Sequence, residues 1–273
     1  MHSHYLMAAL REAWQKSGLE VSCVYGTRDR READLLIPHI DLTHTPSEYV
    51  EYTRSFPNVA NRNVVDISKR SISRHLLRGD EDYVGPVIVK SDNNFGGRPE
   101  YQLSKHRHPI FARAWRRTAP LVEYAFGRRL AWRSWLREYP VYSSLAEVPA
   151  GAFKNRALVV ERFLPEREGD QYFTRHYLCL GDHARSTRVA GSTPVLKRAQ
   201  STLIDEGLPV PDQVLDLRRR LGLDYGKIDY TMHNGQVVIL DVNLTPSGPG
   251  TPEGTERVVA ALADGIWSLL PHT

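Results

Sequence analysis

The sequence has little cysteine, no long apolar run and only a small excess of positive charge. The two cysteines, Cys23 and Cys179, lie far apart and in no CxxC motif, which excludes a disulfide framework and favours reduced thiols. No apolar stretch approaches the about 20 residues that a membrane-spanning helix needs. Lys and Arg exceed Asp and Glu by 36 − 32 = 4, which is weak support for nucleic-acid binding and suits an anionic ligand such as a nucleotide.

What is present is an ordinary globular composition, with 41% hydrophobic and 25% charged residues over 273 positions. The segment 1–14 lacks a basic region followed by a long apolar stretch, so it does not resemble a signal peptide. The aromatic and basic stretch 107–137 would suit RNA, but the spacing of its aromatic residues is typical of a packed core. The sequence therefore predicts a cytoplasmic protein with no membrane and no nucleic acid as partner.

The first residues alternate between helix and strand patterns. Apolar spacing and turn residues predict, in order, a helix, two strands and a second helix, over 5–17, 19–25, 34–40 and 46–54. This alternation is typical of an α/β lobe with a parallel sheet. Such a lobe usually begins with a strand, so we expect that strand either to be missing or to lie upstream of Met1.

The rest of the chain has the pattern of short strands separated by turns and helices. Helices are predicted over 71–78, 211–221 and 253–270, and strands over 87–90, 157–163, 173–180, 185–190, 228–232 and 236–242. Gly181-Asp182 and Asn234-Gly235 are hairpin signals. The C-terminal strands are therefore expected to pair antiparallel.

The last hairpin contains the strongest chemical signal. Asp229 precedes the turn, and Asp241 and Asn243 follow it on one face of the returning strand, because side chains alternate along a strand. All three offer oxygen atoms, the ligands that Mg²⁺ takes together with phosphate oxygens. The alternative is a solvated hairpin whose outer face happens to be polar.

The register of this hairpin decides whether its two aspartates can share a site. A two-residue turn at Asn234-Gly235 would set Asp229 opposite Leu240 and turn Asp241 to the other face. A three-residue loop that begins at His233 and contains a glycine bulge would return the two aspartates to one face. We predict the bulged hairpin.

A second signal lies where a short strand ends in Lys90 and runs into Asn93-Asn94-Phe95-Gly96-Gly97. Gly96 and Gly97 allow backbone N–H groups to approach a phosphate closely. A glycine pair alone is usually an ordinary turn, but directly after a strand-end lysine it indicates a phosphate-binding loop.

The segment KIDYTMHNGQVVILDVNLTPSGPG resembles the C-terminal metal-binding hairpin of the ATP-grasp superfamily, which includes D-alanine–D-alanine ligase and glutathione synthetase. The resemblance extends over roughly 19–260 and identifies no subfamily. It implies that Asp229, Asp241 and Asn243 hold Mg²⁺, with Mn²⁺ as an alternative, against the phosphates of ATP. The superfamily more often has Glu where this chain has Asp241.

The resemblance also assigns roles to other residues of this sequence. It implies nucleotide contacts from two lysines, the glycine loop and a strand that reads adenine, namely Lys69, Lys90, Asn94, Gly96, Gly97, Glu161, Arg162 and Phe163. Either Glu166 or Glu168 would accept the ribose hydroxyls. Cations that face the transferring phosphoryl group would come from Arg175, Arg188 and Lys227.

The fold implied is an α/β chain with ATP bound between two lobes of an ATP-grasp fold. Its parts would be an N-terminal parallel α/β lobe before the ATP-grasp core, a small central lid lobe and a C-terminal lobe with an antiparallel sheet, over 1–68, 69–160 and 161–273. The acceptor would lie against the N-terminal lobe and the loops 193–197 and 245–252.

The function implied is an ATP-dependent carboxylate–amine ligase. A small-molecule carboxylate would become an acyl phosphate, which an amine attacks to give an amide, ADP and phosphate. Two alternatives stay open, a kinase that phosphorylates a small molecule and a degenerate nucleotide-binding protein. The expected partners are the two small substrates, in a monomer or a homodimer.

Overall fold

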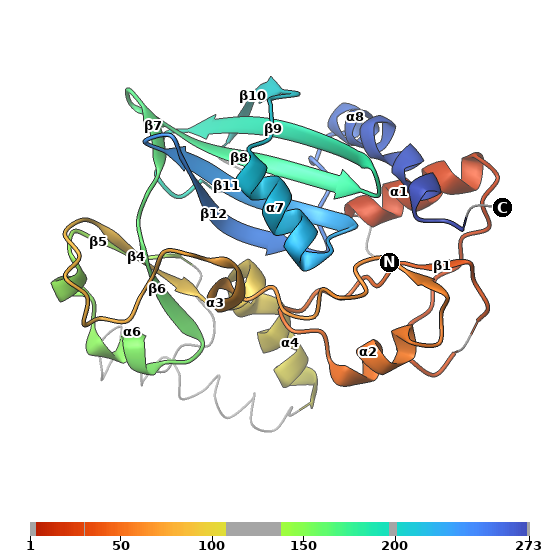
Figure 1. Ribbon diagram of the computed structural model, residues 1–273, viewed down its shortest axis with the longest axis horizontal. Coiled ribbons are helices and arrows are strands. Elements are labelled where there is room, and N and C mark those ends of the chain that lie inside the picture. The colour runs from red at the N-terminus through yellow and green to blue at the C-terminus, as the bar shows by residue number, and fades with distance from the viewer. Residues whose placement is uncertain (1–3, 30, 108–137, 197–200, 272–273) are drawn as a thin grey trace. The chain divides into compact units, whose positions relative to one another are not determined.

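The described residues form three sheets, of which the six-stranded and the two-stranded one belong to unit 1 and the four-stranded one to unit 2 (Figure 1). The computed structural model describes residues 4–29, 31–107, 138–196 and 201–271. Unit 1 combines Met1–Asp66 with Glu166–Thr273, and unit 2 is Ile67–Pro165. The division into three lobes stays a prediction, and most of the aromatic stretch 107–137 lies outside the described residues.

The large sheet of unit 1 is antiparallel and has the strand order β10-β9-β8-β11-β12, with β7 paired to β8. Its strands are β7 (Glu166–Glu168), β8 (Gln171–Leu180), β9 (His183–Gly191), β10 (Thr202–Glu206), β11 (Tyr225–His233) and β12 (Gln236–Asn243). The antiparallel pairing predicted for this region is confirmed.

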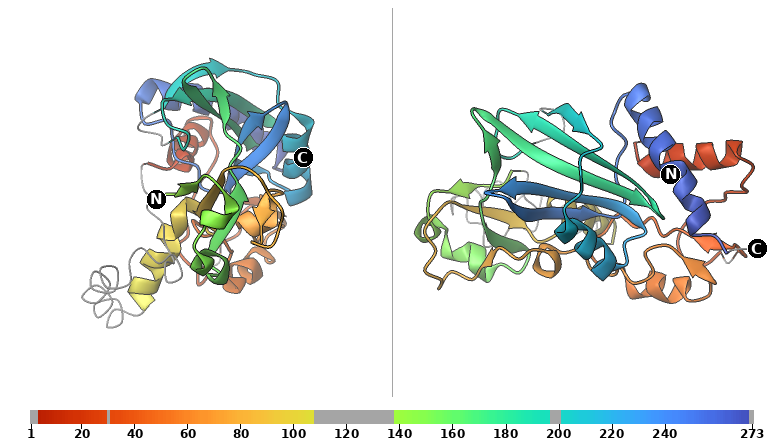
Figure 2. Two further views of the ribbon diagram at one scale, coloured as in Figure 1. Left: turned by 90° about the vertical axis from the view of Figure 1, so that its left-hand side faces the viewer. Right: turned by 45° about the horizontal axis from the view of Figure 1, so that its top comes forward.

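Helices cover the two faces of this sheet. Helix α7 (Asp212–Leu221) lies over β11 and β12 in Figure 1, and its Arg218 donates to the hydroxyl of Tyr177 on β8. On the other face, α1 (Leu6–Lys16) and α8 (Pro252–Leu262) lie side by side (Figure 2). They form one core with the 3₁₀ segment η5 (Ala263–Ser268) and with sheet residues that include Leu178, Leu180 and Tyr225.

The N-terminal part of unit 1 has less strand than its pattern predicts. The predicted strand 19–25 is irregular, and of 34–40 only β1 (Leu35–Leu36) is a strand, parallel to β2 (Asn58–Val59). Helix α2 (Ser47–Thr53) follows Pro46 as predicted. The strand pattern was misleading because apolar side chains such as Leu19 and Val21 pack against the core of α1 and α8 without joining a sheet.

Unit 2 is built on a four-stranded antiparallel sheet in the order β3-β6-β4-β5. Its strands are β3 (Leu76–Leu77), β4 (Val87–Ser91), β5 (Val141–Tyr142) and β6 (Leu158–Arg162), and its helical segments are α3 (Lys69–Ile72), η1 (Asn94–Gly97), α4 (Arg98–Arg107), η3 (Leu145–Glu147) and α6 (Ala150–Lys154). The predicted helix 71–78 is wrong. A helix of four residues ends at Ile72, and β3 then pairs with β6.

The hairpin β11–β12 places Asp229 and Asp241 on one face, as predicted, but the bulge that does so lies elsewhere than predicted. Its turn has two residues, Asn234 and Gly235, both at positive φ, and His233 pairs with Gln236. The predicted three-residue loop is therefore wrong. Instead, the register shifts farther along, between the pairs Tyr230–Ile239 and Asp229–Asp241, so that Leu240 is the extra residue of a bulge.

The mixture of helices with one parallel strand pair and two antiparallel sheets confirms the predicted α/β class. The final helix predicted over 253–270 is two pieces, α8 and then η5. Among the described residues, none of the helices has the length and apolarity to cross a bilayer.

Asn61 joins the N-terminal segment to the large sheet. It lies at φ 56° and is 6% exposed. Its side-chain oxygen accepts from the N–H groups of Asp224 and Tyr225, and its amide donates to Tyr225 O at 2.7 Å. Its own N–H donates to Asp224 Oδ2. One side chain therefore fixes two segments more than 160 residues apart.

We expect Asn61→Ala to lower the free energy of unfolding by about 2 to 4 kcal/mol, because it leaves buried backbone groups without partners. Chemical denaturation measures this loss. Asn58→Ala is the matched control, since half-buried Asn58 donates one side-chain bond, to Asp34 O. Equal stabilities for the two variants would contradict the assignment.

Candidate functional site

One face of the large sheet in unit 1 gathers the predicted metal ligands. The pairs Asp229–Asp241 and Lys227–Asn243 lie directly across β11 and β12, and the pair His176–Asp229 lies across β8 and β11. Paired residues of antiparallel strands point to the same side. We call the face that bears these five side chains the carboxylate face. Along β8 and β11 it continues into the apolar core at Leu178, Leu180 and Tyr225.

Asp229 is held between two basic groups on this face. Lys227 Nζ lies 2.9 Å from Asp229 Oδ2, and His176 Nδ1 lies 2.6 Å from Asp229 Oδ1. Burial by itself would raise the pKa of Asp229, but the charge of Lys227 and the contact with His176 hold this pKa well below its usual range. Asp229 is therefore a carboxylate at any physiological pH.

Asn243 is fixed from the segment that follows β12. Its Oδ1 accepts from Thr245 N–H at 2.8 Å and lies 3.3 Å from the Thr245 hydroxyl. That hydroxyl also donates to Asp41 Oδ1 at 2.9 Å, and Asp41 Oδ2 accepts from the Tyr5 hydroxyl at 2.8 Å. Burial, and then the bond to Asp41, raise the pKa of Tyr5 to about 12, so it remains a donor.

The donor set on the carboxylate face fits a hard divalent cation. Two aspartates lie opposite each other with an asparagine two positions along the strand. Among the described residues, no three His, Cys, Asp or Glu side chains are gathered so that they could hold a metal ion by themselves. A cation here would need further ligands from water or phosphate, as Mg²⁺ commonly does.

Two predicted cations, Arg175 and Arg188, lie on the opposite face of the same sheet. They pair with each other across β8 and β9, and Arg175 pairs with Tyr230, the neighbour of Asp229 on β11. Arg175 donates through Nε and Nη2 to Glu166, and Arg188 Nε donates to Glu166 Oε1 at 3.1 Å. Arg188 also stacks over Phe173, 3.7 Å from the ring centre. The structure thus groups both arginines with Glu166 and separates them from Asp229.

Glu166 and Glu168 differ in how much of each carboxylate is already bound. Glu166 is 5% exposed and accepts from both arginines and from Met232 N–H at 2.9 Å. Burial would raise its pKa, but the bonds from Arg175 and Met232 lower it below its usual value. The Glu168 side chain is 64% exposed and pairs with Arg188.

His176 is the site residue that the sequence did not reveal. It occupies the position on β8 that faces Asp229, whereas the sequence reasoning chose the adjacent Arg175 for its guanidinium group. Alternation along β8 separates the two residues, but only the pairing of β8 with β11 tells which one faces the aspartate. The order of residues by itself could not decide this.

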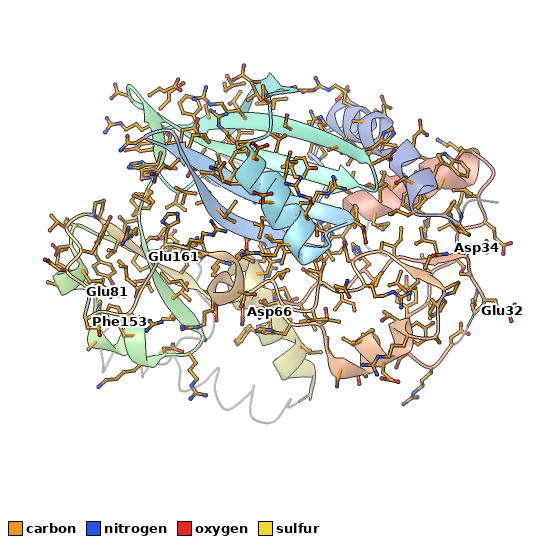
Figure 3. The ribbon with its side chains drawn as sticks, in the orientation of Figure 1. Glu32, Asp34, Asp66, Glu81, Phe153 and Glu161 are labelled. Atoms are coloured by element: carbon orange, nitrogen blue, oxygen red, sulfur yellow. The ribbon has the colours of Figure 1, made fainter. Side chains whose placement is uncertain are left out.

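Unit 2 contains a buried ion pair on the strands β4 and β6. Lys90 Nζ lies 2.7 Å from Glu161 Oε2, and both side chains are less than one-tenth exposed. Figure 3 labels Glu161 on β6. Its other oxygen, Oε1, is buried and receives no hydrogen bond within the described part of the chain. A buried acceptor without a donor is costly, so an N–H or O–H group of a ligand would fit there.

The other predicted nucleotide residues of unit 2 lie around the end of β4. Lys69 begins α3, is 1% exposed and donates to Asn93 O at 3.2 Å. Within η1, Phe95, Gly96 and Gly97 all have positive φ, and Asn94 Oδ1 accepts from Phe95 N–H. The backbone there has the conformation that the glycine pair predicts.

Arg162 is the last residue of β6, Phe163 follows it, and both residues form contacts within unit 2. Their N–H groups donate to His75 O and Pro86 O, both at 2.9 Å. The Arg162 guanidinium lies 5.1 Å from the ring centre of Tyr83. Any contact of these two residues with an adenine ring would therefore use groups other than their N–H.

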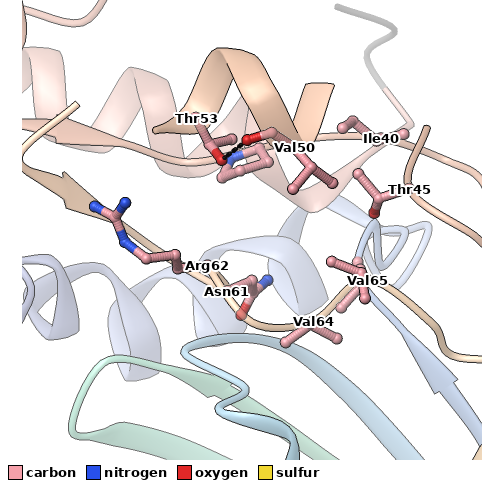
Figure 4. A pocket seen from close by; sticks show the side chains of 10 residues that line it. Ile40, Thr45, Val50, Thr53, Asn61, Arg62, Val64 and Val65 are labelled. Atoms are coloured by element: carbon pink, nitrogen blue, oxygen red, sulfur yellow. Dashed lines mark hydrogen bonds between the residues drawn. The ribbon is translucent and has the colours of Figure 1, made fainter. Parts of the chain in front are cut away.

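A small apolar pocket lies in the N-terminal part of unit 1 (Figure 4). Ile40, Val50, Val64 and Val65 line it, and Leu244, which directly follows Asn243, closes it. Arg62 is on its wall but donates to Phe56 O and Pro57 O. Through Leu244, the pocket is adjacent in sequence to Asn243 of the carboxylate face.

No protein-family model matches the chain, and no curated protein matches it. Similar solved structures are ATP-grasp proteins, the superfamily that the last hairpin resembles. The ligase PsnB, solved with a precursor variant, Mg and ADP, is 13% identical, with a TM-score of 0.45, 82% of this chain covered and 66% of that chain. A RimK-domain ATP-grasp protein from Sphaerobacter thermophilus is 14% identical, with a TM-score of 0.45, 99% of this chain covered and 96% of that chain.

D-alanine–D-alanine ligase from Bacillus anthracis is 12% identical, with a TM-score of 0.34, 73% of this chain covered and 61% of that chain. The chain thus spans less than two thirds of the length of this ligase and of PsnB.

His39 gives the fold a dependence on pH. Both of its ring nitrogens are buried without a hydrogen bond in the described residues, and its ring lies edge-on to Tyr5. Burial lowers its pKa from 6.5 to about 4, although Asp41 opposes this shift. Between these pH values the unfolded chain binds a proton that the folded chain does not.

We therefore expect stability to be complete above about pH 6.5 and to fall as the pH drops towards 4, by at most about 3 kcal/mol from this residue. Urea denaturation at a series of pH values measures the slope. His39→Gln should flatten it, whereas His44→Gln, whose side chain is 62% exposed, should not. A slope that is the same in His39→Gln and the wild type would contradict the assignment.

The ion pairs of Glu166 with Arg175 and Arg188 predict that substitutions of Glu166 and Glu168 affect stability differently. Glu166→Gln should lower the free energy of unfolding by about 3 kcal/mol, because two partly buried arginines lose their counter-charge. Glu168→Gln should cost less than about 1 kcal/mol, since its side chain is largely exposed. Thermal and chemical unfolding distinguish the two. The reverse order would show that Glu166 does not hold the arginines.

Proposed function

We propose that the protein is an ATP-grasp ligase that uses Mg–ATP to activate a carboxylate for attack by an amine. The observation that carries the proposal is the bulge at Leu240, which sets Asp229 opposite Asp241 beside Lys227 and Asn243. β12 is an edge strand of the large sheet, and bulges at sheet edges commonly redirect side chains next to functional sites. Here it brings two carboxylates together on one face, where a divalent cation could bind both.

The metal would be held by Asp229, Asp241 and Asn243, and it would supply positive charge to phosphate oxygens of the nucleotide. Lys227 forms an ion pair with Asp229, and His176 lies at hydrogen-bond distance from it. If Asp229 bound a cation in place of these two groups, Lys227 and His176 would become available to the transferring phosphoryl group. Of the predicted cations, Lys227 therefore has the best support, and His176 joins it. Nothing favours Mn²⁺ over Mg²⁺.

In unit 2, Lys90 would contact a phosphate, with Lys69 and the N–H groups of Asn94, Gly96 and Gly97 supporting it. The unsatisfied Oε1 of Glu161 offers an acceptor for the adenine amino group. Glu168 is the better candidate for the ribose hydroxyls, since Glu166 is saturated by two arginines and Met232. Arg175 and Arg188 would then stabilise the sheet, and their direct role at the phosphate stays a prediction without support from the geometry.

The proposed acceptor is a carboxylate, as the resemblance of the last hairpin to the ATP-grasp superfamily implies. Because ATP supplies the leaving group, the reaction requires no nucleophilic side chain. An acyl phosphate forms as the carboxylate oxygen attacks the γ-phosphorus and ADP leaves. The amine nitrogen then attacks the acyl carbon and phosphate leaves. The chain's contribution is to align these groups and to neutralise their charge.

Screening of ADP release tests the proposal. The purified protein with Mg–ATP should release ADP only with a suitable carboxylate, from a panel of free carboxylic acids, amino acids and peptides with acidic side chains. Hydroxylamine should trap the acyl phosphate as a hydroxamate. ADP formed with a hydroxyl acceptor would favour the kinase. Tight nucleotide binding without any ADP would favour a degenerate protein.

Asp241→Asn should lower kcat by about 100-fold or more, because removing one charged metal ligand weakens stabilisation of the phosphoryl oxygens. Asp170→Asn is the matched control, since that carboxylate is fully exposed at the β7–β8 turn. Coupled measurement of ADP gives both rates. Full activity of Asp241→Asn would exclude the metal site.

A further inference from the structure

The amide of Asn243 is part of a chain of hydrogen bonds that begins at the other end of the sequence. Thr245 N–H donates to Asn243 Oδ1 at 2.8 Å. This bond fixes the orientation of the side-chain amide, with its oxygen towards Thr245. Thr245 itself is 2% exposed, so its hydroxyl needs a partner in the protein. This hydroxyl lies within reach of two acceptors, Asn243 Oδ1 at 3.3 Å and Asp41 Oδ1 at 2.9 Å.

A hydroxyl has a single proton to donate, and a carboxylate is the stronger acceptor. The shorter distance to Asp41 agrees with this choice. Asp41 therefore draws the Thr245 proton away from Asn243 Oδ1. The amide oxygen keeps one lone pair for Thr245 N–H and the second one for another partner, such as a cation.

Tyr5 holds Asp41 in the position that this requires. Its hydroxyl donates to Asp41 Oδ2 at 2.8 Å, so both carboxylate oxygens are fixed. The backbone joins the same segments, because Leu6 N–H donates to Pro246 O at 2.9 Å and Gly248 N–H to His4 O at 3.1 Å. The N-terminal segment is thus attached to the loop that follows β12.

We propose that Tyr5, Asp41 and Thr245 are positioning residues that present the amide oxygen of Asn243 to a divalent cation. The inference rests on the proposed function, since it needs a cation on the carboxylate face. It assigns to the N-terminal segment a part in metal binding, although none of its residues is a metal ligand. Groups that orient metal ligands commonly change metal affinity by about 10- to 100-fold when they are removed.

Two pairs of variants test this. Thr245→Val removes the hydroxyl and keeps the backbone N–H, and Thr245→Ser restores the hydroxyl. Tyr5→Phe removes the hydroxyl that fixes Asp41, and Tyr52→Phe is its control, since the Tyr52 hydroxyl donates at 2.7 Å to Asp29 O elsewhere in unit 1. Calorimetric titration of a non-hydrolysable ATP analogue at a series of Mg²⁺ concentrations gives the apparent Mg²⁺ affinity of each protein.

We expect Thr245→Val and Tyr5→Phe to weaken the apparent Mg²⁺ affinity by about 10-fold. Thr245→Ser and Tyr52→Phe should leave it within about twofold of the wild type. At saturating Mg²⁺, the affinity for the analogue should return to the wild-type value in all four. A purely structural role would instead lower the melting temperature and leave the Mg²⁺ dependence unchanged.

A second measurement needs neither metal nor nucleotide. The side-chain amide resonances of Asn243 in the metal-free protein should coincide for wild type and Thr245→Ser, and should move or broaden in Thr245→Val. Unchanged Mg²⁺ affinity and unchanged resonances in Thr245→Val and Tyr5→Phe would overturn this inference alone. If the wild-type protein shows no Mg²⁺-dependent nucleotide binding, both the inference and the proposed function are wrong.

Discussion

The register shift between β11 and β12 is the constraint on which the site depends. Without the extra residue at Leu240, the tight turn at Asn234-Gly235 would send Asp229 and Asp241 to opposite faces of the sheet. With it, the same strands place their apolar residues against helices near one end and their charged residues together near the other. One added residue therefore joins a core and a candidate metal site on a single face.

Charge in the resting protein is balanced by groups that a nucleotide and a cation would partly replace. Asp229 pairs with Lys227 and His176, and Lys90 pairs with Glu161. Because a buried charge is costly without a partner, each pair stabilises the charged groups within its own unit. In the proposed function, binding of Mg–ATP would be an exchange of ionic partners, which costs less than desolvating bare charges.

The N-terminal segment is attached to the large sheet mainly by side-chain hydrogen bonds and not by strand pairing. Its parallel sheet has only two residues on each strand, yet Asn61 fixes the start of β11 and Asp41 reaches the residues after β12. The start of β11 and the end of β12, which lie side by side at the open end of the hairpin, are therefore both held from the first 66 residues. This explains why a segment with so little regular structure belongs to the same unit as the large sheet.

The sequence by itself determined the α/β class and the antiparallel C-terminal strands, and it indicated Asp229, Asp241 and Asn243 as candidate metal ligands, because periodicity and residue chemistry are local properties. It also indicated Lys90 and the glycines that follow it. Only the tertiary structure decided the place of the bulge, the face of Arg175 and Arg188, and the choice of His176 as the neighbour of Asp229. Those features depend on which strand pairs with which and in what register, and the free energy that selects a register comes from packing between segments far apart in the chain.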